Sequence, residues 1–282
     1  MCVLAAAYWP KFGWVGVKNR DRNYRPVVDF RKSHLQDMER LYIWDEKTRY
    51  TEGINQFGVS ILSASLMTKD DEKEHTKGED EVDYYSPDGK KIRTALLEKS
   101  VKSAVQSCIK QKLSGHTFIF DADTLYLLEG VKLKDDGYSH RILKANKNKK
   151  YVRTNHGILL PKAGYQFGVD EKQTASRESS ESRFNIAKKL TDSAKSPMQL
   201  INQLTYHKLE NPQLNPMRLD KTPSHLKTTG QLMIIPKRST LYYRPILCDI
   251  SFDYPKLNQP HSKTFFELLS MRPLLQDEKV EL

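Results

Sequence analysis

The start of the chain decides the fold: residues 2–21 read CVLAAAYWPKFGWVGVKNRD. The run that ends before Pro10 is apolar, which is typical of a buried strand. The K-F-G that follows supplies a turn, and W-V-G-V then forms a second apolar run. The stretch therefore predicts a β-hairpin whose second strand carries residues 18–21 back to lie beside Cys2.

Strand and helix patterns follow in blocks along the rest of the chain. Apolar residues at spacings of three and four predict a helix over 96–109, and two more helices are expected within 180–204, separated at Ser196-Pro197. Strands are predicted at 59–66, 117–120 and 124–128, and further strands follow, the last of them at 151–157. Three more are predicted at 231–236, 239–243 and 246–252. Strand hairpins, then helices, then strands again indicate an α+β layered protein rather than a parallel α/β sheet.

The composition is that of one globular domain. Lys and Arg number 46 against 35 Asp and Glu, a formal charge of +11, and 38% of the 282 residues are apolar. We predict a single domain over 1–282, with a charged loop at about 68–92. No apolar run approaches the roughly 20 residues of a membrane helix, and the N-terminus lacks the features of a signal peptide, so a cytoplasmic protein is expected.

The cysteines and histidines exclude the common metal and disulfide patterns. Cys2, Cys108 and Cys248 are an odd number at wide spacing, which suits neither a disulfide framework nor a zinc site. The histidines show no H-E-x-x-H spacing. We therefore expect no metal and no other cofactor.

The excess of basic residues favours polyanions only weakly. Counterion release raises the affinity of any cationic surface for nucleic acid or anionic lipid. The basic residues here are scattered, however, in clusters such as 144–150, rather than gathered in one stripe with interleaved aromatic residues. This pattern argues against a nucleic-acid partner, and a solvated basic surface is the simpler interpretation.

Cys2 is notable because it directly follows Met1. Initiator methionine is usually removed before a small residue, which would leave Cys2 with a free α-amino group. An α-amine has a pKa of about 7.7–8.0, so it can accept the thiol proton, and one residue then supplies both nucleophile and base. The alternative is that Cys2 is a chance residue at the edge of a strand, and position alone favours that interpretation.

Several short motifs accompany Cys2 in order along the chain. They are M-C at 1–2, K-N-R-D at 18–21, G-I-N-Q-F-G-V at 53–59, R-T-N-H at 153–156 and E-S-R-F at 181–184. Together they resemble the N-terminal-nucleophile hydrolases of the choloylglycine hydrolase type, which include bile salt hydrolases and penicillin V acylases. They also resemble the related acyl-CoA:isopenicillin N acyltransferase group. Residues 19–26 are similar to the start of the NRDE group, with Arg22 in place of its Glu.

The resemblance implies a fold and four catalytic residues. The fold is a four-layer αββα sandwich with two antiparallel sheets. Cys2 would be the nucleophile, and Asp21 would orient its amine. Asn155 would donate its side-chain amide to the oxyanion of the tetrahedral intermediate. Arg183 would stabilise negative charge near the cysteine.

The resemblance also suggests three residues that bind substrate. The family's arginine falls on Lys18, which keeps the charge but not the planar fork, whereas Arg20 supplies a guanidinium two residues later. Since positions 18 and 20 share one face of a strand, either could serve. The family's second asparagine falls near Ser65, so this chain departs from the family at the second oxyanion donor.

The activity implied is hydrolysis of a linear non-peptide amide through an acyl-cysteine, with a small-molecule amide as substrate. Transfer of the acyl group to another amine, as in the isopenicillin N acyltransferase group, is one alternative. A non-catalytic anion-binding protein on the same fold is another. The sequence leaves the acyl group, the amine and a homo-oligomeric state open.

Overall fold

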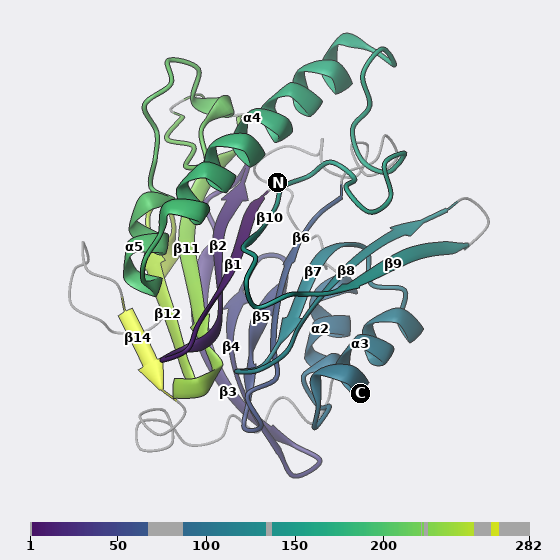
Figure 1. The fold of residues 1–282 in the computed structure, drawn as a ribbon, viewed down its shortest axis with the longest axis vertical. Helices are drawn as coiled ribbons and strands as arrows, with labels where there is room; N and C mark the ends of the chain where they lie inside the picture. Colours follow the sequence, from purple (N-terminus) through teal and green to yellow (C-terminus); the bar gives the residue numbers. More distant parts are fainter. Residues whose placement is uncertain are drawn as a thin grey trace.

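The computed structural model describes residues 2–66, 87–133, 137–220, 222 and 225–250, and the backbone of 261–264. Within these residues the strands form two sheets (Figure 1). The first has the order β10-β1-β2-β11-β12-β14, made of β10 (Tyr151–Arg153), β1 (Cys2–Trp9), β2 (Gly13–Arg22), β11 (Lys227–Ile235), β12 (Thr240–Pro245) and β14 (His261–Thr264). The second has the order β13-β3-β4-β5-β6-β7-β8-β9, made of β13 (Asp249–Ile250), β3 (Val27–Leu35), β4 (Met38–Asp45), β5 (Thr51–Asn55), β6 (Ser60–Ala64), β7 (Gly115–Phe120), β8 (Leu125–Lys132) and β9 (Tyr138–Lys144).

The hairpin predicted at the start of the chain is formed by β1 and β2. The two strands pair antiparallel over the whole length of β1, from Cys2 opposite Arg20 to Trp9 opposite Gly13. Gly13 has a φ of +71°, and a Cβ there would lie 2.4 Å from the carbonyl oxygen of Ala122. Glycine is therefore required at this turn. The pairing places the end of β2 beside Cys2, as the sequence predicted.

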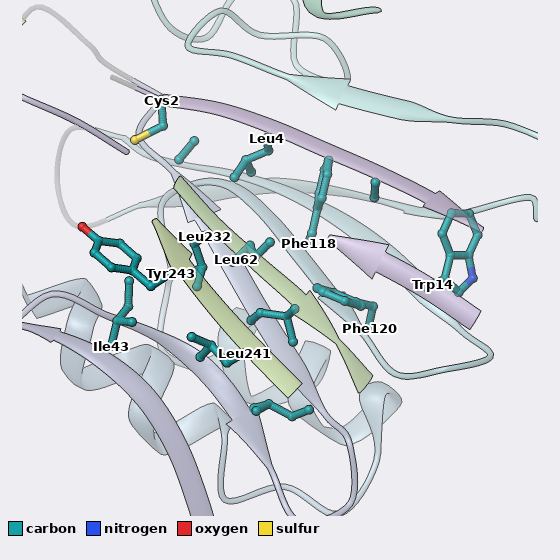
Figure 2. Packing of buried hydrophobic residues seen from close by; sticks show 14 of the residues in the cluster. Cys2, Leu4, Trp14, Ile43, Leu62, Phe118, Phe120, Leu232, Leu241 and Tyr243 are labelled. Carbon is teal, nitrogen blue, oxygen red and sulfur yellow. The ribbon is translucent and has the colours of Figure 1, made fainter. Parts of the chain in front are cut away.

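The apolar stretch of β1 is continuous because both faces of the strand are buried. Cys2, Leu4 and Ala6 point into the core between the two sheets, which Figure 2 shows from close by. Val3 and Ala5 point the other way, into a second core under the helices of the first sheet. Residues on alternate sides of a strand thus build two separate cores, and the first sheet lies inside the molecule.

Helices cover the outer face of each sheet, which completes the predicted four layers. The helices are α2 (Pro87–Ala95), α3 (Val101–Lys110), α4 (Glu171–Ser193) and α5 (Pro197–Gln203), with 3-10 turns at Pro212–Leu214 and Pro236–Arg238. Figure 1 shows α4 and α5 on the side of β1 and β2, and α2 and α3 on the side of β7 and β8. Among the described helices, none is long and apolar enough to cross a membrane.

Three details differ from the sequence predictions. The second sheet is not wholly antiparallel, since the short strand β13 pairs parallel with β3. The helix predicted over 96–109 begins only at Val101, as α3, because Ser100 forms a capping box there, and residues 96–100 form the turn between α2 and α3. The charged loop predicted at about 68–92 includes residues 87–92, which belong to α2, whereas 67–86 lie outside the described residues.

The helical region after β10 also begins earlier than predicted. α4 starts at Glu171 rather than near Ser180, because Asp170 caps its first turn and accepts the N–H of Gln173. The predicted break at Ser196-Pro197 is confirmed, with Ser196 as the N-cap of α5 and the proline in its first turn. The sequence patterns did not predict the hairpin of β3 and β4, whose polar residues interrupt the apolar alternation.

Candidate active site

Cys2 lies at the first position of β1, at one end of the core between the sheets. It is 2% exposed, and Figure 2 shows it at the opposite end of the core cluster from Trp14. Its backbone nitrogen donates a hydrogen bond of 3.1 Å to Oδ1 of Asn155. The guanidinium of Arg22 lies on its other side, with Nη1 3.9 Å from the sulfur. Cys2 is therefore held between a carboxamide and a cation.

The surroundings of Cys2 favour the thiolate. Burial alone would raise its pKa, but the charges of Lys18, the N-terminus and Arg22 together outweigh burial and lower the pKa to about 7. Cys108, in the core beneath α3, shows the opposite behaviour, because burial raises its pKa to about 12. One of the two buried thiols is thus poised to react at neutral pH.

We expect iodoacetamide to alkylate Cys2 at a rate that rises with pH and reaches half its maximum near pH 7. The sign follows from the lowered pKa, since the thiolate is the reacting form and is the major form above that pH. Arg22→Gln should move the half-maximum to higher pH, whereas Arg25→Gln, at an exposed ion pair, should leave it in place. Peptide mass spectrometry at each pH assigns the modified cysteine. A Cys2 that reacts no faster than Cys108 at pH 7 would contradict this account.

The cations beside Cys2 form a row on one face of β2. Lys18, Arg20 and Arg22 alternate along the strand and point between the sheets, toward two buried carboxylates of the second sheet. Lys18 Nζ lies 2.5 Å from Glu52, and Arg20 lies 3.5 Å from Glu52 and 3.8 Å from Asp45. Arg22 Nε lies 3.6 Å from Asp45.

The count of charges in this row favours a third anion. The side chains of Lys18 and Arg20 are 1% and 0% exposed, and that of Arg22 is 14% exposed. Three cations therefore share two carboxylates in a region of low dielectric, where unbalanced charge is costly. Ionisation of Cys2 adds a third negative charge to this region, which agrees with its lowered pKa.

Asp21 and Arg183 come together on the opposite face of β2. Arg183 of α4 donates from Nη2 to Oδ2 of Asp21, and a second guanidinium, that of Arg218, lies 3.6 Å from the same oxygen. Thr228 donates to the other carboxylate oxygen at 2.8 Å. Asp21, Arg183 and Arg218 are all buried. The orienting role of Asp21 and the charge-stabilising role of Arg183 remain predictions. The hydrogen bond between the two side chains fixes the position of both.

Asn155 joins Cys2 to the end of β6. Its Nδ2 donates to the carbonyl oxygen of Ser65 at 2.6 Å, while its Oδ1 accepts from Cys2. A carboxamide carries two N–H donors, so one N–H of Asn155 is left for another acceptor. Ser65 itself is exposed at this edge and contributes its backbone carbonyl, so a role for its side chain in binding substrate stays a prediction.

The sequence patterns did not reveal several residues of the site. Arg22 stood out only as a departure from the NRDE motif, although its spacing from Lys18 and Arg20 would have placed it on their face. Asp45, Glu52 and Arg218 had no signal, because their partners lie far away in the chain. Among the described residues, no group of three or more His, Cys, Asp or Glu is arranged to hold a metal ion.

Comparisons with known proteins support the fold. No family model matches the sequence, and no curated protein matches it. The structure is similar to that of a mutant of the conjugated bile acid hydrolase from Clostridium perfringens, with a TM-score of 0.54 and 13% identity, over 95% of this chain and 93% of that one. It is also similar to the N-acylethanolamine-hydrolyzing acid amidase ortholog from Caenorhabditis elegans, with a TM-score of 0.51 and 11% identity, over 83% and 93% of the two chains. These likenesses show that the chain has the fold of the N-terminal-nucleophile hydrolases, as its motifs predicted.

Proposed function

We propose that this protein is an N-terminal cysteine amidohydrolase that cleaves a linear non-peptide amide through an acyl-Cys2 intermediate. The observation that carries the proposal is the juxtaposition, at the start of β1, of a thiol whose pKa is about 7 with the Asn155 carboxamide. This pair of groups lies in a chain whose fold is similar to that of the two hydrolases named above. A small-molecule amide is the substrate class that these neighbours suggest.

The first half of the reaction forms the acyl-cysteine. Removal of Met1 exposes the α-amine of Cys2, whose nitrogen already lies 3.1 Å from Oδ1 of Asn155. The amine takes the thiol proton, and the sulfur attacks the amide carbonyl to give a tetrahedral oxyanion. The remaining N–H of Asn155 donates to that oxyanion. Collapse breaks the C–N bond, and the α-ammonium returns the proton to the leaving nitrogen, so an amine departs.

The second half releases the acid. The α-amine, now neutral, takes a proton from water, and the hydroxide attacks the thioester carbonyl. Collapse of this second tetrahedral intermediate expels the Cys2 thiolate, which Lys18 and Arg22 stabilise. In this scheme Lys18 acts on the charge of Cys2 as well as on any bound substrate, whereas Arg20 acts on the substrate alone.

Acyl transfer to a second amine is the alternative that one observation favours. The T-N-H at 154–156 resembles the acyltransferase group more closely than the choloylglycine group. Both reactions share the acyl-Cys2 intermediate and differ only in whether water or an amine attacks it. Adding a primary amine to the assay separates them, since an acyltransferase converts the acyl group into a new amide.

The proposal is tested by trapping the intermediate. The purified protein is incubated with a panel that contains a conjugated bile acid, an N-acylethanolamine, penicillin V and simple N-acyl amides, and is then quenched in acid. We expect a mature chain without Met1, a mass increase equal to one acyl group on Cys2, and release of the free acid. A chain that keeps Met1, takes no acyl group and binds polyanions in a salt-sensitive way would instead establish the non-catalytic alternative.

A further inference from the structure

A buried carboxylate holds the segment that follows Asn155. Glu129 lies on β8 and is 0% exposed. It accepts the backbone N–H groups of residues 158–160, at 3.0 Å for Ile158 and 2.9 Å each for Leu159 and Leu160. Burial raises its pKa, but the contacts with His116 and with these N–H groups outweigh burial and lower the pKa to about 2. Glu129 is therefore an ionised side chain that ties this segment to the second sheet.

Glu129 also reaches the residue next to Asn155 through a histidine. His116 lies opposite Glu129 on the neighbouring strand β7, and its Nδ1 is 3.3 Å from Oε2 of Glu129. Its Nε2 is 2.9 Å from the carbonyl oxygen of His156. Because a carbonyl oxygen only accepts, Nε2 must donate, and Nδ1 can then donate to the carboxylate only when the ring carries both protons. As an imidazolium, His116 forms an ion pair with Glu129 and links this carboxylate to the backbone just after Asn155.

A second clamp holds the same segment from the opposite side. Ser180 of α4 is buried, and its Oγ accepts the backbone N–H of Asn155 at 2.8 Å. The same oxygen lies 2.9 Å from Nδ1 of His156. Asn155 therefore sits between an anchor on the helix layer and an anchor on the second sheet. With the backbone fixed on both sides, the carboxamide is directed toward Cys2.

We propose that Glu129 is a positioning residue for the acyl-transfer chemistry, which it serves by holding Asn155 through His116 and the 158–160 backbone. The inference rests on the proposed function, because it assigns Glu129 an effect on the Asn155–oxyanion contact. A displacement of about 1 Å in a catalytic group can cost about 100-fold in rate. Glu129→Gln replaces one of the two acceptor oxygens by an NH2 group, so the N–H groups of residues 158–160 lose part of their shared acceptor and the segment is free to shift.

The test separates acylation of Cys2 from alkylation of Cys2. Acylation by a p-nitrophenyl ester passes through an oxyanion and needs Asn155, whereas alkylation by iodoacetamide displaces iodide directly and does not. In Glu129→Gln we expect acylation to be about 10- to 100-fold slower and alkylation at pH 7 to be unchanged within about twofold. The double variant Glu129→Gln, Asn155→Ala should be no slower than Asn155→Ala alone, because both changes remove one interaction.

A pair of substitutions at His116 gives an independent readout. Gln at this position places an amide N–H near the site of Nε2 and can still donate to His156, whereas Asn places its amide near Nδ1 and cannot reach that carbonyl. We expect both substitutions to slow acylation, because each breaks the path from Glu129 to His156 at one end, and we expect His116→Gln, which keeps the contact with His156, to slow it less. Asp121→Asn is the matched control, since Asp121 accepts two backbone N–H groups at the other end of the same hairpin, at 2.8 and 2.7 Å.

The outcomes are decisive in each direction. Three results would overturn the proposal. They are an equal loss of acylation and alkylation in Glu129→Gln, additive effects in the double variant, and no loss of either rate. If Glu129→Gln does not fold, the two His116 variants decide by the same comparison. Failure of the wild-type protein to be acylated at Cys2 would instead refute the proposed function, so the two failures are distinguishable.

Discussion

Cys2→Ala is expected to abolish turnover of every amide that the wild-type protein hydrolyses. The substitution removes the nucleophile while leaving Asn155 and the cation row in place. Loss of the nucleophile in a comparable hydrolase costs about 10⁶-fold in kcat, so no turnover should be measurable above the buffer rate. The measurement is the amount of free acid released over several hours, determined by chromatography.

Two further variants show that the effect belongs to the Cys2 thiol. Cys2→Ser keeps the shape of the side chain, but a hydroxyl is far less acidic than a thiol whose pKa is about 7, so we expect turnover to fall by several orders of magnitude. Cys108→Ala removes a thiol that is also buried but lies in the α3 core, and it should retain wild-type turnover. Full activity in Cys2→Ala, with the melting temperature unchanged, would refute a nucleophilic role.

Asp21→Asn is expected to destabilise the fold strongly. The Asp21 carboxylate is shared by Arg183 and Arg218, both of which are 0% exposed. Removing one partner of a buried ion pair costs about 3–5 kcal/mol, because it leaves an uncompensated charge in a region of low dielectric. Here two guanidinium groups lose their common partner. Urea denaturation followed by tryptophan fluorescence measures the free energy of unfolding.

A control on α4, the helix that carries Arg183, separates this effect from charge removal in general. Asp192 pairs with Lys188 four residues earlier on α4, and both side chains are exposed. Asp192→Asn should change the free energy of unfolding by less than about 0.5 kcal/mol. Equal effects of Asp21→Asn and Asp192→Asn would mean that the buried pair contributes little to stability. If Asp21→Asn also slows acylation in the part of the population that stays folded, that result supports the predicted role beside Cys2.

Local patterns in the sequence were enough for the core of the fold. The apolar run, turn and second run at the start of the chain predict the β1–β2 hairpin, because pairing within a hairpin depends on residues close in sequence. The break at Ser196-Pro197 follows from capping chemistry for the same reason. The strands β3 and β4 were missed, since polar residues interrupt their alternation and only the partner sheet decides which side is buried.

For the candidate site, too, the sequence predicted some features and the tertiary structure was needed for the others. The sequence by itself determined that a cysteine stands at the start of a strand, that K-N-R-D returns beside it, and that a T-N-H segment follows much later in the chain. Only the tertiary structure decided that Asp45 and Glu52 pair with the cation row, that Arg183 and Arg218 share Asp21, and that Glu129 holds the segment of Asn155. These contacts join residues far apart in the chain, and their energy depends on burial and on distances of a few ångströms. Neither burial nor these distances can be predicted from the local pattern of residues.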